Sequence, residues 1–278
     1  MKTKKPTICG YAFATVRFAL AVLWVFLNLP FILLSPGGRI GAWQFRFLMR
    51  GICFFAGFRT CVYGELAKSR PLLLVGNHIS VVELGAVPAA LGNNFFGKDT
   101  IAKMPIIGFI GRKVGSIFIS RNPAMAAEMT RLIKEKTEHA TWPMMIYPEG
   151  TSTNGAIVAP FKSAMFSIAE PQLSGDKNAA QFTIQPVVMM FRDKCGCKLS
   201  DADLAYNYAY FDPARFPVDG VKIVERSTIG QVFHIIALGG MVVELHLLPP
   251  PPLAGIADRK ELAEYLHKIV EQKYMELK

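Results

Sequence analysis

Residues 72–83 read LLLVGNHISVVE, a short apolar run that leads directly into a polar turn. The run from Leu72 to Val75 is typical of a strand that is buried on both faces. Amphipathic stretches such as Ala124–Ala140, typical of helices, separate this run from others of its kind. Those other runs lie at Ser116–Ile119, Met144–Tyr147, Ile184–Met190 and Met241–Leu248. The alternation predicts an α/β fold, in which helices cover a mixed, largely parallel sheet.

The composition indicates an ordered protein that contacts a membrane. The chain has 278 residues, enough for one large domain or two small ones. It is 51% hydrophobic and only 19% charged, which excludes a disordered chain. Five cysteines exclude a scaffold built on disulfides, and Cys195 and Cys197 have no second pair of ligands at zinc spacing. We therefore expect no metal site.

The positive charge is concentrated at the N-terminus. Residues 1–64 hold eight Lys and Arg and no Asp or Glu, although the whole chain carries only +10. A cationic apolar segment of this kind favours the anionic face of a bilayer over nucleic acid. We expect residues 1–64 to form membrane-anchoring helices and residues 65–278 to form the α/β domain.

Two helices are expected within this basic segment. Phe18–Leu34 is apolar enough for a marginal span or a re-entrant anchor, which Pro30 should kink or end. A signal peptide is the alternative, but no A-x-A cleavage site follows. The second helix carries Trp43 and three phenylalanines at helical spacing, with Arg46 and Arg50 on another face. Its arginines are expected to face lipid phosphates; an ordinary core-packing helix is the alternative.

The turn after Val75 holds a histidine and an acid that could move a proton. Histidine is the usual side chain for proton transfer near neutral pH, and a carboxylate can orient its second ring nitrogen. His78 and Glu83 are five residues apart, so on one regular helix they would point away from each other. They can meet only if His78 lies in the turn and Glu83 in the first turns of the helix. A lone structural histidine is the alternative.

A second polar loop, YPEGTSTNG at residues 147–155, follows another apolar run. Its glycines and hydroxyls let a backbone approach a ligand, at the edge where open α/β sheets bind ligands. A plain turn is the alternative. Residues 150–154 also approach the G-x-S-x-G elbow of hydrolases, but Asn154 replaces the second glycine. Two cations, Lys98 and Arg121, end apolar runs, and Pro186 indicates an edge strand or bulge that lines an apolar groove.

These clusters, in this order between Pro71 and Pro186, resemble the glycerolipid acyltransferases. This is the lysophospholipid acyltransferase superfamily, which includes the 1-acylglycerol-3-phosphate acyltransferases. The resemblance implies a membrane-bound O-acyltransferase that moves a fatty acyl chain from acyl-CoA or acyl carrier protein to a lysophospholipid hydroxyl. It implies no metal, no further cofactor and no covalent acyl-enzyme. It also places the protein in a bacterial inner membrane or the endoplasmic reticulum, with the active site on the cytoplasmic side.

The resemblance also assigns roles to single residues. It implies that His78 is the general base and that Glu83 orients it. The remaining family positions are implied to bind substrate: Lys98 and Arg121 at the acceptor phosphate, Glu149, Gly150 and Thr151 around the acceptor, and Pro186 near the acyl groove.

Two positions depart from the family pattern. The first motif usually ends in Asp where this chain has Glu83, and Ser152 replaces the arginine that phosphatidate-forming members usually carry after E-G-T. The loss of that cation favours an acceptor with a head group. A lysophosphatidate acyltransferase with an altered phosphate clamp, a lipid hydrolase and a non-catalytic lipid-binding scaffold remain the alternatives.

Overall fold

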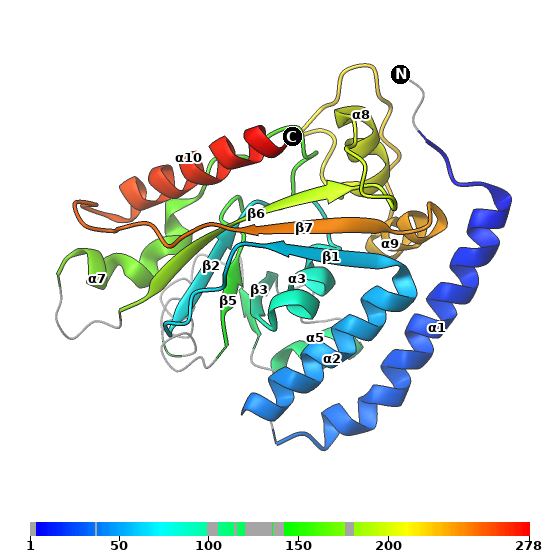
Figure 1. Cartoon of the computed structure of the whole chain (residues 1–278), viewed down its shortest axis with the longest axis horizontal. Helices are drawn as coiled ribbons and strands as arrows, with labels where there is room; N and C mark the ends of the chain where they lie inside the picture. The colour runs from blue at the N-terminus through cyan, green and yellow to red at the C-terminus, as the bar shows by residue number, and fades with distance from the viewer. Residues whose placement is uncertain are drawn as a thin grey trace.

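The chain folds around one mixed sheet that is mostly parallel (Figure 1). The structure, a computed structural model, describes residues 4–36, 38–98, 105–113, 116–119, 135, 142–175 and 181–278. Within these residues the strand order is β1-β7-β6-β2-β5-β3-β4. The strands are β1 (Phe58–Tyr63), β2 (Leu72–Gly76), β3 (Asn94–Lys98), β4 (Ile117–Ile119), β5 (Met144–Ile146), β6 (Thr183–Arg192) and β7 (Met241–Leu247). Only β6 and β7 pair antiparallel, so the expected fold class is confirmed.

Each apolar run expected to be a strand is one, and β2 is fully buried. β1 was not expected, because Arg59 and Thr60 interrupt its apolar residues and half of its side chains are exposed at the sheet edge. It pairs in parallel with β7 along its whole length. The sheet therefore starts at Phe58, before the expected boundary at residue 64. The expected helix Ala124–Ala140 lies outside the described residues, apart from Glu135.

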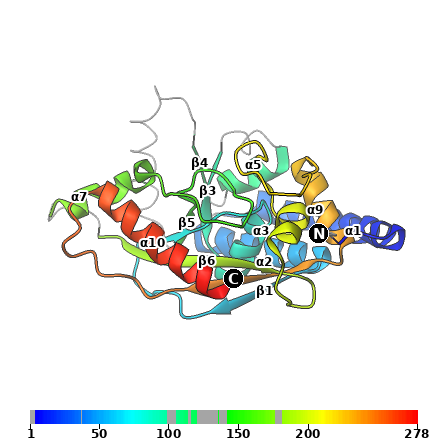
Figure 2. The same cartoon turned by 90° about the horizontal axis from the view of Figure 1, so that it is seen from above.

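The helices lie around this sheet, with α1 and α7 at opposite ends of the molecule (Figures 1 and 2). They are α1 (Ile8–Leu33), α2 (Gly38–Ala56), α3 (Glu83–Leu91), α5 (Pro105–Lys113), α7 (Glu170–Leu173), α8 (Asp201–Asp203), α9 (Thr228–Ala237) and α10 (Arg259–Leu277). A 3₁₀ segment spans Ser163–Ala169 and a π-helical segment spans Leu204–Tyr208. α1 packs against α2 and α9, whereas α10 packs on β6. The Asp258 carboxylate caps α10 by accepting from the backbone N–H groups of Lys260 and Glu261.

α1 is the helix expected over Phe18–Leu34, but it begins ten residues earlier, at Ile8. Pro30 does not end it, because the proline lies in the last turns and its carbonyl still accepts from Leu34 N at 3.0 Å. The helix is long and apolar enough to cross a membrane, and only 11% of its most apolar window is buried. Apolar side chains such as Phe26 and Phe31 stay more than half exposed, so α1 could anchor the protein to a bilayer.

α2 combines both interpretations of the second helix. Arg46 and Arg50 do not face lipid: their Nε atoms donate to Ala89 O at 3.4 and 3.0 Å. These bonds satisfy carbonyls in the last turn of α3, where the helix dipole attracts cations. The aromatic face of α2 does not pack on the domain in this way, because Trp43 and Phe54 are 61% and 75% exposed. α2 therefore packs on the domain with its arginines and presents aromatic side chains outward.

The expectation that Pro186 marks an edge or a bulge is wrong. Pro186 lies in β6, between β7 and β2, and pairs with Val75. Its carbonyl accepts from Leu248 N at 3.0 Å, so its ring nitrogen faces the β7 side of the strand. Since β7 ends at Leu247, the missing N–H falls at the margin of that pairing and costs no ladder hydrogen bond.

Candidate active site

The turn between β2 and α3 is pinned to the neighbouring strand by a buried asparagine. Asn77 Nδ2 donates to Met189 O at 3.0 Å, and Asn77 Oδ1 accepts from Met189 N at 2.8 Å. This pair of bonds ties the turn to β6 in place of the strand pairing that ends at Gly76. The only local signal for Asn77 in the sequence is its place between a strand and a histidine.

His78 lies in this turn, and Glu83 is the first residue of α3, so the condition for their meeting is fulfilled. His78 Nδ1 hydrogen-bonds Glu83 Oε2. Glu83 Oε1 accepts from the N–H groups of Ile79 at 2.8 Å and Ser80 at 3.1 Å, and the side chain is fully buried. A carboxylate held this way keeps the proton on Nδ1, which leaves Nε2 free to accept another. The imidazole keeps 19% of its side-chain surface exposed.

The imidazole also lies against an aromatic ring. Tyr147 stacks on His78, with ring centroids 4.4 Å apart and an angle of 24° between the planes. Burial first and the Glu83 charge second raise the pKa of the Tyr147 hydroxyl well above its ordinary value. The ring is therefore an uncharged platform that fixes the plane of the imidazole. Nothing in the sequence assigned this function to Tyr147.

The YPEGTSTNG loop holds the backbone of His78 from both sides. Glu149 Oε1 accepts from His78 N at 2.6 Å, and Glu149 Oε2 accepts from Ala159 N at 2.7 Å. Thr153 N donates to His78 O at 2.8 Å. Glu149 is 1% exposed, and burial raises the pKa of its carboxyl to about 8 despite these N–H donors, with the Glu83 charge adding to the rise. The glutamate therefore positions His78 instead of facing a solvent-filled site.

Substituting Glu149 with glutamine should destabilise the protein by about 1–3 kcal/mol, because one buried N–H then faces an amide NH₂ group. The difference should depend on pH. Burial raises the folded-state pKa from 4.5 to about 8, so the protonated carboxyl is favoured by folding. The stability that the wild type gains from the protonated carboxyl is complete below pH 4.5 and is lost as the pH rises through 8. Glutamine does not titrate, so its destabilising effect should be largest at pH 5 and smallest at pH 8. Thermal unfolding of both proteins in detergent at pH 5, 6.5 and 8 tests this, and a constant difference between them would contradict it.

The same loop approaches a cation, Lys162, that no sequence motif marks. Gly150 has φ +67°, and a Cβ there would lie 2.5 Å from Lys162 Nζ. Glycine at this position therefore allows the ammonium to lie against the loop. Ser152 Oγ donates to Tyr210 O, and both Thr151 and Ser152 line a cavity of about 370 Å³. Lys162 was hidden because it lies in a segment without strand or helix periodicity.

Of the remaining expected site residues, one borders the turn, one lies two strands away and one is outside the described residues. Pro186 is level with Val75, two residues before Asn77, so it borders the same end of β2. Lys98 is the last residue of β3, two strands away from β2. Arg121 lies outside the described residues. Within the part of the chain that the structure describes, no cluster of three or more His, Cys, Asp or Glu side chains could hold a metal ion.

Comparison with known proteins shows which family the region around this site resembles. Residues 59–190, which contain the turn, the loop and Pro186, match the acyltransferase family. This part of the chain is similar to an acyltransferase domain. The match starts within β1, in agreement with the finding that this strand is part of the sheet.

Two relatives and one solved structure show how far the likeness extends. The lyso-ornithine lipid O-acyltransferase of Pseudomonas aeruginosa is 26% identical over 231 residues, 81% of this chain and 76% of the relative. The 1-acyl-sn-glycerol-3-phosphate acyltransferase of Neisseria gonorrhoeae is 29% identical over 108 residues, 38% of this chain and 42% of the relative. These acyltransferases confirm the expectation of an O-acyltransferase.

The fold has a close structural counterpart. The crystal structure of the 1-acyl-sn-glycerophosphate acyltransferase PlsC of Thermotoga maritima covers 97% of this chain and 96% of its own, with a TM-score of 0.65. At 15% identity this likeness shows the fold alone.

Proposed function

We propose that this acyltransferase uses His78 to transfer an acyl chain from a thioester to the free hydroxyl of a lysolipid. His78 Nε2 takes the hydroxyl proton while the oxygen attacks the thioester carbonyl. The tetrahedral intermediate collapses, the carbon–sulfur bond breaks, and the imidazolium returns the proton to the leaving thiolate. The observation that carries this proposal is the buried Glu83 carboxylate, held by two backbone N–H groups and bound to His78 Nδ1. That arrangement stabilises the imidazolium as it forms.

The test is release of free thiol by the purified protein in detergent, across a panel of lysolipids. Release that requires both a lysolipid and His78 is the expected result. The assay is run with acyl-CoA and with acylated carrier protein, because either thioester fits the proposal. Thiol release without any acceptor would indicate a hydrolase. If neither donor gives turnover with any lysolipid, the scaffold alternative replaces this proposal.

For the acceptor we infer a lysolipid whose head group carries both charges, as an ornithine head group does with its carboxylate and ammonium. The cavity beside Thr151 and Ser152 supports this, because its walls include Arg226 as well as Asp212 and Glu225. Arg226 Nη1 donates to Tyr206 O at 2.9 Å, and the guanidinium stacks on the Tyr206 ring at 5.2 Å. A guanidinium fixed at the wall matches a carboxylate, and the acids match an ammonium.

Two further observations favour this acceptor. Ser152 stands where phosphatidate-forming members of the family resembled usually carry an arginine, so one cation for a phosphate is missing here. The Pseudomonas relative, which acts by name on a lyso-ornithine lipid, is matched over most of its length, whereas the phosphatidate-forming relative is matched over less than half. Competition between lyso-ornithine lipid and lysophosphatidate in the thiol-release assay distinguishes the two acceptors, and preference for lysophosphatidate would contradict this choice.

Substituting Arg226 with glutamine should raise the acceptor KM about tenfold, because a charge-assisted contact to the head group is lost. The donor KM should stay unchanged. Arg215→Gln is the matched control, since Arg215 is exposed, stacks on Phe216 and does not line the cavity. Steady-state kinetics with either substrate varied give both constants. A rise in the donor KM alone would remove Arg226 from the acceptor site.

The basic N-terminal helices anchor the enzyme in our proposal, with the active site on the cytoplasmic side. The outward apolar surface of α1 supports the anchor, and the cytoplasmic supply of acyl thioesters supports the orientation. Cys195 and Cys197 are exposed in the loop after β6 and give a convenient probe. An impermeant maleimide should label them in inverted vesicles and not in intact cells, and the reverse result would contradict the orientation.

A further inference from the structure

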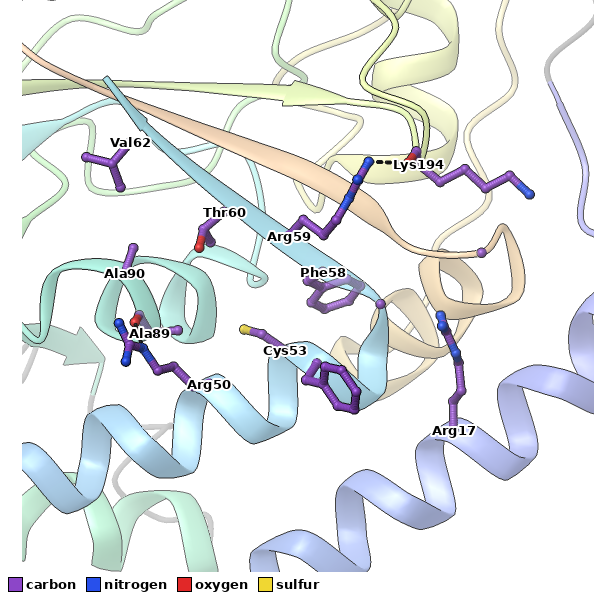
Figure 3. Close-up of a pocket in the computed structure, with 13 residues that line it drawn as sticks. Arg17, Arg50, Cys53, Phe58, Arg59, Thr60, Val62, Ala89, Ala90 and Lys194 are labelled. Atoms are coloured by element: carbon purple, nitrogen blue, oxygen red, sulfur yellow. Dashed lines mark hydrogen bonds between the residues drawn. The ribbon is translucent and has the colours of Figure 1, made fainter. Parts of the chain in front are cut away.

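A second cavity lies at the junction of the anchor and the sheet, and it is lined by cations (Figure 3). It measures about 590 Å³ and is bounded by α1, α2, β1, the end of α3 and the loop after β6. Four of its lining residues are basic and none is acidic: Arg17, Arg50, Arg59 and Lys194. Arg17, Arg50 and Arg59 belong to the basic segment 1–64, whereas Lys194 comes from the loop after β6, so only the fold brings the four together.

Two glycines make room for the cations. Gly57 and Gly239 have φ +75° and +98°, and each leaves open the space where a Cβ would stand. A Cβ at Gly57 would lie 2.1 Å from Arg17 Nη1, and one at Gly239 would lie 2.7 Å from Lys194 Cδ. The same Gly57 Cβ would be 3.2 Å from Gly239 O, so both cations approach one small region of backbone.

The third cation fixes this arrangement. Arg59 Nη2 donates to Lys194 O at 2.7 Å, as the dashed line in Figure 3 shows. The bond ties β1 to the loop that carries the lysine. The acid beside that lysine, Asp193, is turned to its own loop, where Oδ1 accepts from the N–H groups of Cys195 and Cys197.

The Arg17 guanidinium lies over the Phe13 ring, 4.9 Å from its centroid. Its Nη1 atom is buried and has no hydrogen-bond partner among the described residues. A buried guanidinium nitrogen without an acceptor is unfavourable, and the neighbouring Lys194 adds repulsion. An anion in the cavity would relieve both.

We propose that this cavity binds the phosphate of an anionic membrane phospholipid. Arg17 is the tenth residue of α1 and immediately precedes the charge-free segment Phe18–Leu34. It stands at head-group level when that segment, and not the first turns of α1, lies in the bilayer. Phe54, 75% exposed, lines the same cavity and offers an apolar surface to an acyl chain. A ligand with a phosphate and an acyl chain fits both features, whereas a soluble phosphate uses only the first.

The cavity is distinct from the candidate active site. It contains Ala89 and Ala90 in the last turn of α3, while Glu83 begins that helix. Six to seven helical residues separate Glu83 from these alanines, about 10 Å along the helix axis. A lipid bound here would therefore be a structural tether. It would join α1, β1 and the loop after β6, and would hold the sheet at a fixed height on the membrane.

The test is isothermal titration of the full-length protein in detergent with dihexanoyl phosphatidylglycerol. We expect it to bind at least about tenfold more tightly than dihexanoyl phosphatidylcholine, and the double variant Arg17→Gln/Lys194→Gln to lose about tenfold of that affinity. The matched control is Lys222→Gln/Lys260→Gln, which removes the same charge from exposed residues outside the cavity and should bind as the wild type does. Thermal unfolding without lipid verifies that the variants fold.

Three outcomes would overturn the proposal. One is equal affinity of the wild type and the Arg17/Lys194 variant for phosphatidylglycerol. Another is equal affinity of the wild type for phosphatidylglycerol and phosphatidylcholine. The third is binding of inorganic phosphate or coenzyme A as tight as that of phosphatidylglycerol and lost in the same variant, which would assign the site to a soluble phosphate. None of these outcomes depends on the acyl transfer reaction.

Discussion

Replacing His78 with alanine should lower kcat for acyl transfer by about a thousandfold, which is the usual contribution of a general base. The variant keeps the backbone bonds that hold the turn, because Glu149 binds His78 through its N–H and Thr153 binds its carbonyl. The fold and membrane binding should therefore be unaffected. The measurement is acceptor-dependent thiol release, with flotation on vesicles as the measure of membrane binding.

His246→Ala is the matched control for this variant. His246 lies on β7, stacks on Tyr63 with centroids 4.6 Å apart and is separated from β2 by β6. Its loss should leave kcat within about twofold, as expected for a group outside the reaction. If His78→Ala retains more than a tenth of the wild-type kcat, His78 is not the base and the proposed mechanism is wrong.

Glu83→Gln should lower kcat almost as much, although it only replaces one carboxylate oxygen with an NH₂ group. The amide oxygen can still accept from Ile79 N and Ser80 N, so its NH₂ group turns toward His78 Nδ1. The imidazole must then carry its proton on Nε2, which is the nitrogen that should accept the substrate proton. The corresponding exchange in serine protease triads costs about ten thousandfold in kcat, and a loss of about 10³ to 10⁴ is expected here.

Nitrogen NMR of the His78 ring distinguishes this tautomer effect from a general loss of structure. The wild type should show Nδ1 protonated at neutral pH, and Glu83→Gln should show Nε2 protonated with an unchanged thermal midpoint. Glu83→Asp, the residue usual in the family, keeps the charge but is one methylene shorter. It should recover much of the activity. If the glutamine variant keeps the wild-type tautomer and still loses activity, the orienting role of Glu83 is refuted.

The sheet was predictable because burial on both faces leaves a mark in the sequence. A run such as Leu72–Val75 must be apolar throughout, and β2, β5 and β6 all carry such a run. β1 escaped prediction because an edge strand needs apolar residues on one face only. The location of Pro186 in the middle of the sheet could not be predicted. Its neighbours in the sequence do not show on which side of β6 its missing N–H lies, or where β7 ends.

The pairing of His78 with Glu83 could be anticipated, since a strand–turn–helix context puts residues five apart within reach. Glu149 was expected at the acceptor, and only the fold shows that its two oxygens bind backbone N–H groups of His78 and Ala159. The arginines of α2 were likewise expected to face lipid, because their partners are distant in the sequence. Their actual partners, carbonyls at the end of α3, lie about forty residues away in the chain.

The sequence by itself determined the fold class, the likeness to the acyltransferases and the two residues proposed for proton transfer, because apolar runs and short-range motifs act over a few neighbouring residues. Only the tertiary structure decided which polar groups meet across the chain: the Glu149 clamp, the arginine bonds to α3, and the cluster of Arg17, Arg59 and Lys194. Such contacts are made by single side chains whose partners are set by strand order and helix packing. They satisfy buried charges and backbone groups one at a time, so they leave no periodic signal in the sequence.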